Sequence, residues 1–317
     1  MKISILGAAG SIGQTLSLLL KLYLPEGSKL YLHDVKPVMA GLALDLNHIP
    51  TNIEVKSFVG ENPSPALKNA DIVIIAAGIP RKPGMEREDL FKINANIILN
   101  LTKQIALTSP NALIGIITNP INTTVVIAAE VLKHYSSYSR DRLFGITSLD
   151  IMRAKIFVSE MKEKKLNCIN VPVIGGHSNK TILPLLSQVI NVDFNEQEII
   201  AITKRVQQAG SEVVYAKAGS GSATLSMGYA ATCFCLSLLS ALKGEDNILE
   251  YAYVEGDCKY AKFFTQPFIV GKYGIKEYKK IGPLSKFEQK KLENIINYIN
   301  QDILLGEIFV KEFFNNK

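Results

Sequence analysis

The stretch KISILGAAGSIGQ, residues 2–14, decides the fold of this chain. A short apolar run from Lys2 to Leu6 precedes a turn with glycine at positions 7, 10 and 13, and apolar residues at helical spacing then continue to Tyr23. In such a turn the glycines let backbone amides approach a pyrophosphate, and the start of the helix adds partial positive charge. The stretch therefore predicts a strand, a phosphate-binding turn and a helix.

A second strand completes this unit. The run from Lys29 to His33 ends at Asp34, which lies about twenty residues after the last glycine. A carboxylate at that position accepts hydrogen bonds from an adenosine ribose and repels the additional phosphate of NADP. Since no arginine directly follows Asp34, we expect the unit to bind NAD.

Later apolar runs continue the alternation of strand and helix, which is typical of a parallel sheet with crossover helices. The expected strands are residues 53–59, 71–76 and 112–117. Ligands bind at the carboxyl ends of the strands in doubly wound sheets. We therefore expect an α/β fold built on a Rossmann-type doubly wound parallel sheet, with its functional residues in the loops after these strands.

Two of these loops carry polar side chains. Arg81 and Arg87 lie in a segment punctuated by Pro and Gly after the strand at 71–76, and Asn119 follows the strand at 112–117. The residues alone leave two interpretations open for the arginines, exposed loop positions or ligand contacts. Asn119 is equally compatible with a turn or a helix cap.

A second informative stretch is VPVIGGHSNKTILPLL, residues 171–186. Gly175 and Gly176 allow the chain to turn between two apolar strand-like runs, which places His177 at a strand end. An imidazole there can serve as a general acid or base, although a lone histidine is more often a hydrogen-bonded structural residue. His177 is therefore a candidate whose role depends on the rest of the chain.

The segment LFGITSLDIMRA, residues 143–154, leads into a long helix capped by Thr147 or Ser148. Asp150 and Arg153 are three residues apart and share a neighbouring face, so a simple intrahelical ion pair explains their spacing as well as a functional role does. We expect the apolar stripe of this helix to consist of Ile151, Ala154, Val158 and Met161.

Composition excludes several classes of protein. The net charge of +6 over 317 residues is spread thinly and does not interleave with aromatic residues, which argues against nucleic-acid binding. The four cysteines include a C-x-C pair and lack the spacing of a zinc site, so we expect no metal and free thiols in a reducing compartment.

No basic leader precedes the first apolar segment, which indicates a cytoplasmic protein. The longest uncharged stretch, residues 218–242, is long enough to cross a membrane. Serine and threonine occur throughout it, and we therefore expect a buried helix and no membrane association.

Taken together, these segments resemble the NAD-dependent malate dehydrogenases, the enterobacterial and mitochondrial type within the lactate/malate dehydrogenase superfamily. The resemblance covers essentially the whole chain, and Ser11 is a small departure because glycine is common there. The segments that carry the resemblance are GAAGSIGQ, DLNHIP, AGIPRKPGMEREDLF, IGIITNPINTT, LFGITSLDIMRA, VPVIGGHS, AKAGSGSATLSMG and YVEGD.

The resemblance implies catalytic roles for three residues. His177 would accept the proton of the malate hydroxyl, and Asp150 would orient the ring and stabilise the imidazolium. Arg153 would bind the carboxylate next to the reacting carbon in a bidentate geometry that lysine does not reproduce.

The resemblance also implies contacts with the remainder of the substrate and with the cofactor. Arg81 would bind the far carboxylate of the substrate, Arg87 would lie near the reacting oxygen, and Asn119 would contact both substrate and nicotinamide. The residues implied for NAD binding are Gly7, Ala8, Ala9, Gly10, Ser11, Ile12, Gly13, Asp34, Asn94, Ile117, Asn119 and Met227.

The implied organisation is an NAD-binding Rossmann domain in residues 1–145 and an α+β substrate domain in residues 146–317 that ends in a helix from Ser285 to Lys311. Family members of this type suggest a homodimer acting on malate and oxaloacetate in the tricarboxylic acid cycle. Two alternatives are a lactate-type 2-hydroxy acid dehydrogenase of the same fold and a non-catalytic NAD-binding protein. In the lactate-type enzymes, the position that matches Arg81 resembles a glutamine. A non-catalytic protein could lack His177 or Arg153.

Overall fold

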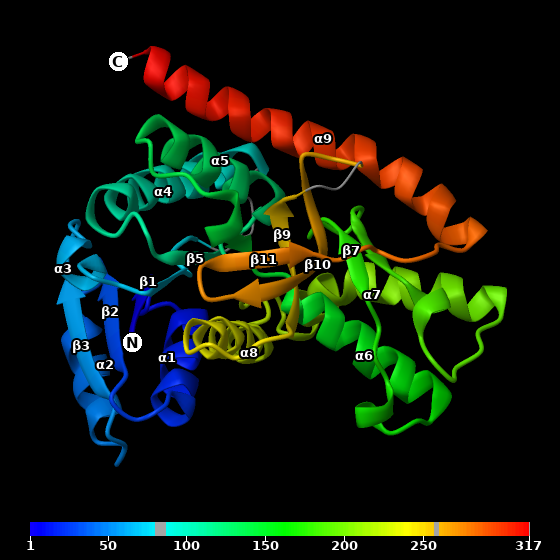
Figure 1. Cartoon of the computed structure of the whole chain (residues 1–317), viewed down its shortest axis with the longest axis horizontal. Helices are drawn as coiled ribbons and strands as arrows, with labels where there is room; N and C mark the ends of the chain where they lie inside the picture. Colours follow the sequence, from blue (N-terminus) through cyan, green and yellow to red (C-terminus); the bar gives the residue numbers. More distant parts are fainter. Residues whose placement is uncertain (80–86, 257–259, 317) are drawn as a thin grey trace.

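A single sheet runs through the molecule, with helices packed on its faces (Figure 1). The structure is a computed structural model that describes residues 1–79, 87–256 and 260–316, and the side chains of Arg87 and Asp89 also lie outside the description. Among these residues the sheet has eleven strands, ordered β3-β2-β1-β4-β5-β6-β9-β10-β7-β8, with β11 paired to β10.

The first half of the chain forms the parallel part of the sheet, in which β1 pairs with both β2 and β4. All three expected later strands are present, and the four residues of β4 are buried, as a continuous apolar run predicts. The elements of this half are β1 (Lys2–Leu6), α1 (Ser11–Tyr23), β2 (Lys29–Asp34), α2 (Met39–Asn47), β3 (Glu54–Val59), α3 (Ser64–Leu67), β4 (Ile72–Ile75), α4 (Arg87–Thr108), β5 (Leu113–Ile116), α5 (Ile121–His134) and β6 (Leu143–Gly145).

The second half adds antiparallel strands to the same sheet, since β9 pairs antiparallel with β6 and β10. The expected fold class, a Rossmann-type parallel sheet followed by an α+β part, is confirmed. The elements are α6 (Ser148–Lys162), β7 (Val173–Gly175), β8 (Ile182–Pro184), α7 (Glu196–Ala216), α8 (Leu225–Leu242), β9 (Ile248–Glu255), β10 (Phe263–Gly271), β11 (Gly274–Tyr278) and α9 (Lys286–Asn315).

Helix α8 is long and apolar enough to cross a membrane by length and composition. It packs against α1, β9 and β10, however, and Phe234, Cys235 and Leu238 at its centre are at most 1% exposed. Core helices of soluble proteins pass the same test of length and composition. This position agrees with the buried helix predicted from residues 218–242.

Two smaller expectations about side chains have mixed outcomes. Ala154 and Val158 on α6 are buried, but Met161 is 40% exposed because the helix ends at Lys162, one residue later. The prediction of an apolar stripe was therefore wrong at Met161. Cys168, Cys233 and Cys235 are free thiols, and Cys258 lies outside the described residues.

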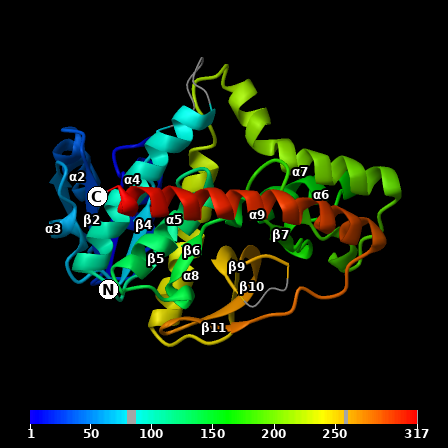
Figure 2. The same cartoon turned by 90° about the horizontal axis from the view of Figure 1, so that it is seen from above.

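Helix α9 crosses the molecule from the region of β7 to the far end of α5 (Figure 2). A capping box starts it, because the Ser285 side chain accepts from the Glu288 backbone N–H and the Glu288 side chain accepts from the Ser285 backbone N–H. Ile295, Ile299 and Ile303 are at most 5% exposed and form its buried stripe. The helix continues to Asn315, four residues beyond the predicted Lys311.

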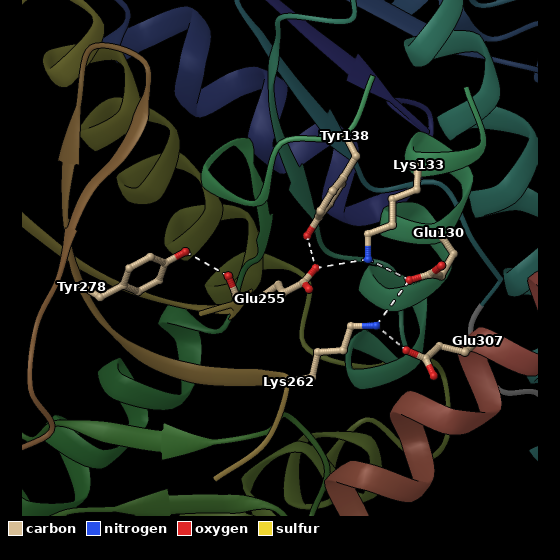
Figure 3. A network of polar contacts seen from close by, with 7 residues as sticks. All are labelled: Glu130, Lys133, Tyr138, Glu255, Lys262, Tyr278 and Glu307. Atoms are coloured by element: carbon tan, nitrogen blue, oxygen red, sulfur yellow. Dashed lines mark hydrogen bonds and ion pairs between the residues drawn. The ribbon is translucent and has the colours of Figure 1, made fainter. Parts of the chain in front are cut away.

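A polar network ties α9 to α5 and β9 (Figure 3). The Tyr138 hydroxyl donates to the Glu255 carboxylate, and burial together with this bond raises the pKa of Tyr138. Lys133 also contacts Glu255, with its Nζ 3.4 Å from Oε2. On the other side of the network, Lys262 pairs with Glu307 of α9 and with Glu130 of α5. These contacts join α9 to α5 and, through Glu255, to β9.

Candidate active site

His177 lies in the turn that joins β7 to β8, as the glycine hinge predicts. Gly175 has a φ of +102°, and a Cβ there would lie 2.1 Å from the Thr181 carbonyl oxygen. Only glycine adopts this backbone without strain, so the turn depends on it. The hinge thus presents the imidazole at the end of a short buried strand.

The His177 ring contacts a carboxylate directly. Its Nδ1 lies 2.6 Å from Asp150 Oδ2, and the two side chains are 12% and 1% exposed. An ionised carboxylate only accepts hydrogen bonds, so Nδ1 carries the proton and Nε2 is left free to accept one. The pair is therefore arranged for general-base chemistry at Nε2.

Asp150 lies in the first turn of α6, and Arg153 follows one turn later on the same helix. Asp150 Oδ1 has no hydrogen-bond partner among the described residues and is 3.8 Å from Arg153 Nη1. Burial lowers the pKa of Arg153, while the charges of Asp150 and Glu212 act in the opposite direction. This loose ion pair leaves the guanidinium able to bind a further carboxylate.

The glycine turn after β1 is packed closely against backbone atoms and leads into the N-terminus of α1. A Cβ on Gly7 would lie 2.3 Å from the Ala77 backbone nitrogen, and a Cβ on Gly13 would lie 2.3 Å from the Gly7 oxygen. Helix α1 starts directly after this turn and has no acidic residue in its first turn. Its N-terminal partial charge is therefore available to an anionic group.

Asp34 ends β2 beside this turn and is 9% exposed. Its Oδ2 accepts the Ala9 backbone N–H at 3.0 Å, and its Oδ1 accepts the Lys36 backbone N–H at 3.2 Å. A carboxylate has about four lone-pair sites, so these two bonds leave room for ribose hydroxyls. The carboxylate is thus held at the position that the sequence indicates for the adenosine ribose.

Two asparagines connect the loops after β4 and β5. Asn94 on α4 is 2% exposed and accepts the Ile79 backbone N–H at 2.9 Å. Its Nδ2 donates to the Asn119 carbonyl oxygen at 2.8 Å. Asn94 therefore holds the two loops together, whereas Asn119 is exposed and its side chain is available to a ligand.

Ile117 and Met227 were also predicted near the cofactor. Both are buried, at 3% and 5% exposure, in the apolar cluster that contains Ala8 and Ala9. Their role in cofactor binding stays a prediction. Among the residues that the structure describes, no group of three His, Cys, Asp or Glu side chains could hold a metal ion.

Comparison with known proteins agrees with this arrangement. Residues 1–145 match the model for the lactate/malate dehydrogenase NAD binding domain, and residues 147–310 match the model for the lactate/malate dehydrogenase alpha/beta C-terminal domain.

The chain belongs to the lactate/malate dehydrogenase family.

Similarity within the family extends over nearly the whole chain. A malate dehydrogenase of Yersinia enterocolitica is 61% identical over 311 residues, which cover 98% of this chain and 100% of that protein. The crystal structure of Cryptosporidium parvum malate dehydrogenase has a TM-score of 0.81 at 29% identity and covers 96% of this chain and 98% of that one. Lactate dehydrogenase from Eimeria maxima with NADH and oxamate has a TM-score of 0.80 at 28% identity, covering 95% of this chain and 92% of that one.

In this family member the fold brings several predicted residues together, while two remain outside the structural description. His177, Asp150 and Arg153 form one cluster, and the glycine turn and Asp34 form a second. Arg81 lies outside the described residues, and Arg87 begins α4 with an undescribed side chain. The roles of individual residues remain predictions.

One residue that contacts the His177 turn, Asn122, was not predicted from the sequence. Asn122 Oδ1 accepts the His177 backbone N–H at 2.7 Å, although the two residues are 55 positions apart. In the sequence, Asn122 stands near the start of a helical pattern, where asparagine is common. Because no local pattern connects positions this distant, only the fold reveals the contact.

Proposed function

We propose that this chain catalyses the reversible NAD-dependent oxidation of (S)-malate to oxaloacetate. The single observation that carries the proposal is the buried His177–Asp150 pair at 2.6 Å, with Arg153 one helical turn from Asp150. Family membership and the 61% identity to a Yersinia enterocolitica malate dehydrogenase support the choice of reaction.

Proton transfer is the task of His177. In malate oxidation, Nε2 accepts the proton of the C2 hydroxyl, and the Asp150 carboxylate stabilises the resulting imidazolium. In oxaloacetate reduction, the same nitrogen returns the proton to the carbonyl oxygen. NAD, when bound, supplies the acceptor of the C2 hydride in the first direction and its donor in the second.

Substrate orientation is the task of the arginines. Arg153 binds the carboxylate attached to C2, and its partial burial strengthens this charge-assisted bond. The resemblance implies that Arg81 would bind the second carboxylate and that Arg87 would act near the reacting oxygen, although both side chains lie outside the described residues. Asn119 holds the substrate next to the nicotinamide. The exposed side chain of Asn119 is compatible with this role.

Cofactor preference provides one prediction. We expect NADH to be used at least about 100-fold more efficiently than NADPH, because the Asp34 carboxylate would face the added phosphate. Each tenfold difference in efficiency corresponds to about 1.4 kcal/mol. Asp34→Asn should raise the efficiency with NADPH, since it removes the charge but keeps an oxygen for the Ala9 N–H. The measurement is kcat/KM with each cofactor at fixed oxaloacetate. Equal use of the two cofactors by the unmodified chain would contradict the assignment of Asp34.

We further propose that two copies associate through α1, α6 and α8. These helices lie along one side of the molecule (Figure 1), and large apolar side chains are exposed on them. Leu22 and Tyr23 on α1 are 47% and 59% exposed, and Leu225 and Tyr229 on α8 are 73% and 52% exposed. Apolar patches of this kind mark association surfaces. Sedimentation velocity should give twice the mass of one chain, and a monomer at micromolar concentration would contradict the proposal.

We also propose that the chain is located in the cytoplasm and that it acts in the tricarboxylic acid cycle. The location is supported by the free thiols among the described residues and by the predominantly buried α8.

The reaction itself is tested by the oxidation of three candidate substrates with NAD. We expect NADH to form with (S)-malate and to form far more slowly with (R)-malate and (S)-lactate. Formation of NADH from (S)-lactate at an efficiency equal to that with (S)-malate would instead indicate a lactate-type enzyme. If no substrate reduced NAD, the chain would be a non-catalytic member of the family.

A further inference from the structure

Asn122, the second residue of α5, bridges the His177 turn and helix α9. The residue is 2% exposed, and its Oδ1 accepts the His177 backbone N–H at 2.7 Å. On the other side, its Nδ2 donates to Asp302 Oδ2 at 2.8 Å. A carboxylate on the C-terminal helix is therefore connected to the main chain of the catalytic histidine through one buried amide.

We propose that Asp302 is a positioning residue for His177, acting by fixing the orientation of the Asn122 carboxamide. The inference rests on the proposed function, in which His177 is the general base. A carboxamide has an acceptor on one side and donors on the other. The His177 backbone N–H can only donate, and an ionised Asp302 can only accept. Together, the His177 N–H and the Asp302 carboxylate allow only one orientation of the Asn122 amide, with its oxygen toward His177 and its NH₂ group toward Asp302.

Thr181 does not substitute for Asp302 in this respect. Its Oγ1 lies 3.3 Å from Asn122 Nδ2 and also accepts the Ser178 backbone N–H at 3.0 Å. A hydroxyl both donates and accepts, so it can satisfy either orientation of the amide. Without the carboxylate, the His177 N–H alone selects the orientation of the amide, and a reversed amide would present its NH₂ group to that N–H. That contact between two donors would push the turn away.

The turn has little space to absorb such a change. A Cβ on Gly176 would lie 2.6 Å from Asn122 Nδ2 and 2.6 Å from Thr181 Oγ1, so the amide is packed directly against the backbone. The next residue is His177, whose ring must keep its 2.6 Å contact with Asp150. A misplacement of about 1 Å in a catalytic group typically costs about 100-fold in rate.

The surroundings of Asp302 also indicate a specific role. Burial raises the pKa of its carboxyl, and the hydrogen bond from Asn122 opposes that shift. None of the ion pairs found among the described residues includes Asp302. Burial, together with the nearby charge of Asp302, raises the pKa of Tyr253, whose buried hydroxyl has no hydrogen-bond partner among the described residues. Burial of a carboxyl group without a cation is costly, which is unexpected for a residue that only packs.

A second acidic residue on the same helix makes contacts that do not involve Asn122. Glu307, five residues later on α9, pairs with Lys262 (Figure 3), which also contacts Glu130 of α5. A change at Glu307 removes a carboxylate from the same helix without touching Asn122. Glu307→Gln is therefore the matched control for substitutions at Asp302.

The first experiment compares Asp302→Leu, Asp302→Asn and Glu307→Gln in the reduction of oxaloacetate. We expect Asp302→Leu to lower kcat by about 10- to 100-fold, with the Kd for NADH almost unchanged and a larger primary isotope effect from deuterated NADH. Asp302→Asn both donates and accepts, as the Thr181 hydroxyl does, so it should give a kcat between those of Asp302→Leu and the unmodified chain. Glu307→Gln should behave as the unmodified chain. A merely structural role would reduce the active fraction and leave the isotope effect unchanged, so that result would overturn the proposal.

An exchange of the two side chains keeps the test decisive if Asp302→Leu does not fold. Asn122→Asp alone places two carboxylates at one contact and should lower kcat strongly. Combined with Asp302→Asn, it restores one carboxylate and one amide, so kcat should recover by at least about tenfold over the single variant. Failure of the exchange to restore kcat would contradict the proposal. If the unmodified chain does not reduce oxaloacetate at all, the proposed function fails, and that outcome is distinct from a failure at Asp302.

Discussion

His177→Asn is expected to lower kcat for oxaloacetate reduction by about 10³- to 10⁴-fold, the range for loss of a histidine base supported by a carboxylate. The ring is the only group at the site that we assign to proton transfer, and its Nδ1 is already occupied by Asp150 at 2.6 Å. The Kd for NADH should change by less than about threefold, because cofactor binding uses different residues. Asparagine keeps an amide that can donate to Asp150, so the carboxylate is not left without a partner.

Single-turnover kinetics and NADH fluorescence titration measure the two quantities separately. Asp150→Asn provides a companion variant, since it removes the charge that stabilises the imidazolium and should also lower kcat. If the affinity for NADH fell in step with the activity of His177→Asn, then His177 would be a structural residue of the turn. That result would contradict its assignment as the base.

Arg81→Gln is expected to lower the efficiency of oxaloacetate reduction by about 30-fold to several thousand-fold. The far carboxylate of oxaloacetate needs a fixed cation in a site closed to water, and loss of one partner of a buried charge pair costs about 2–5 kcal/mol. Pyruvate presents a methyl group there and would lose nothing. In the unmodified chain, pyruvate would enclose an unpaired guanidinium, so glutamine should also relax the selection against pyruvate.

The measurement for Arg81 is the ratio of kcat/KM for oxaloacetate and pyruvate in the unmodified chain and in the variant at fixed NADH. Arg81→Lys serves as a control, because it keeps the charge but loses the bidentate geometry. Its ratio should lie between those of the unmodified chain and Arg81→Gln. A change in the ratio of less than about tenfold, or about 1.4 kcal/mol, would mean that Arg81 does not discriminate between the substrates.

Local patterns in the sequence were sufficient for the parallel part of the fold. Gly7 and Gly13 leave no room for side chains, since a Cβ on either would lie 2.3 Å from backbone atoms. A steric constraint this strict permits only glycine, so it can be recognised from the residue type alone. The strand that ends at Asp34 and the fully apolar β4 are likewise determined by neighbours in the sequence.

Contacts between distant segments could not be predicted in the same way. Asn122 and Asp302 are 180 positions apart, and each is an ordinary polar residue on a helix. Asn94 was expected near the cofactor from the resemblance alone, whereas its hydrogen bonds to Ile79 and Asn119 depend on how two loops meet. Such pairs are set by tertiary packing, which periodicity and spacing do not encode.

Helix boundaries and exposure were less certain for the same reason. Met161 fits the apolar stripe of α6 by spacing, but α6 ends at Lys162 and leaves the side chain 40% exposed. The sequence of α8 has the length and hydropathy of a membrane helix, although its serines and threonines favoured a buried helix. Its packing against α1 and the sheet agrees with that prediction.

The most direct test of malate dehydrogenase activity is NADH oxidation by the purified chain with oxaloacetate and with pyruvate side by side. We expect oxaloacetate to be reduced with a kcat/KM at least about 1,000-fold above that of pyruvate, a difference of about 4 kcal/mol in transition-state stabilisation. Reduction of pyruvate at an equal or greater efficiency would contradict the account and identify the chain as a lactate-type enzyme of the same family.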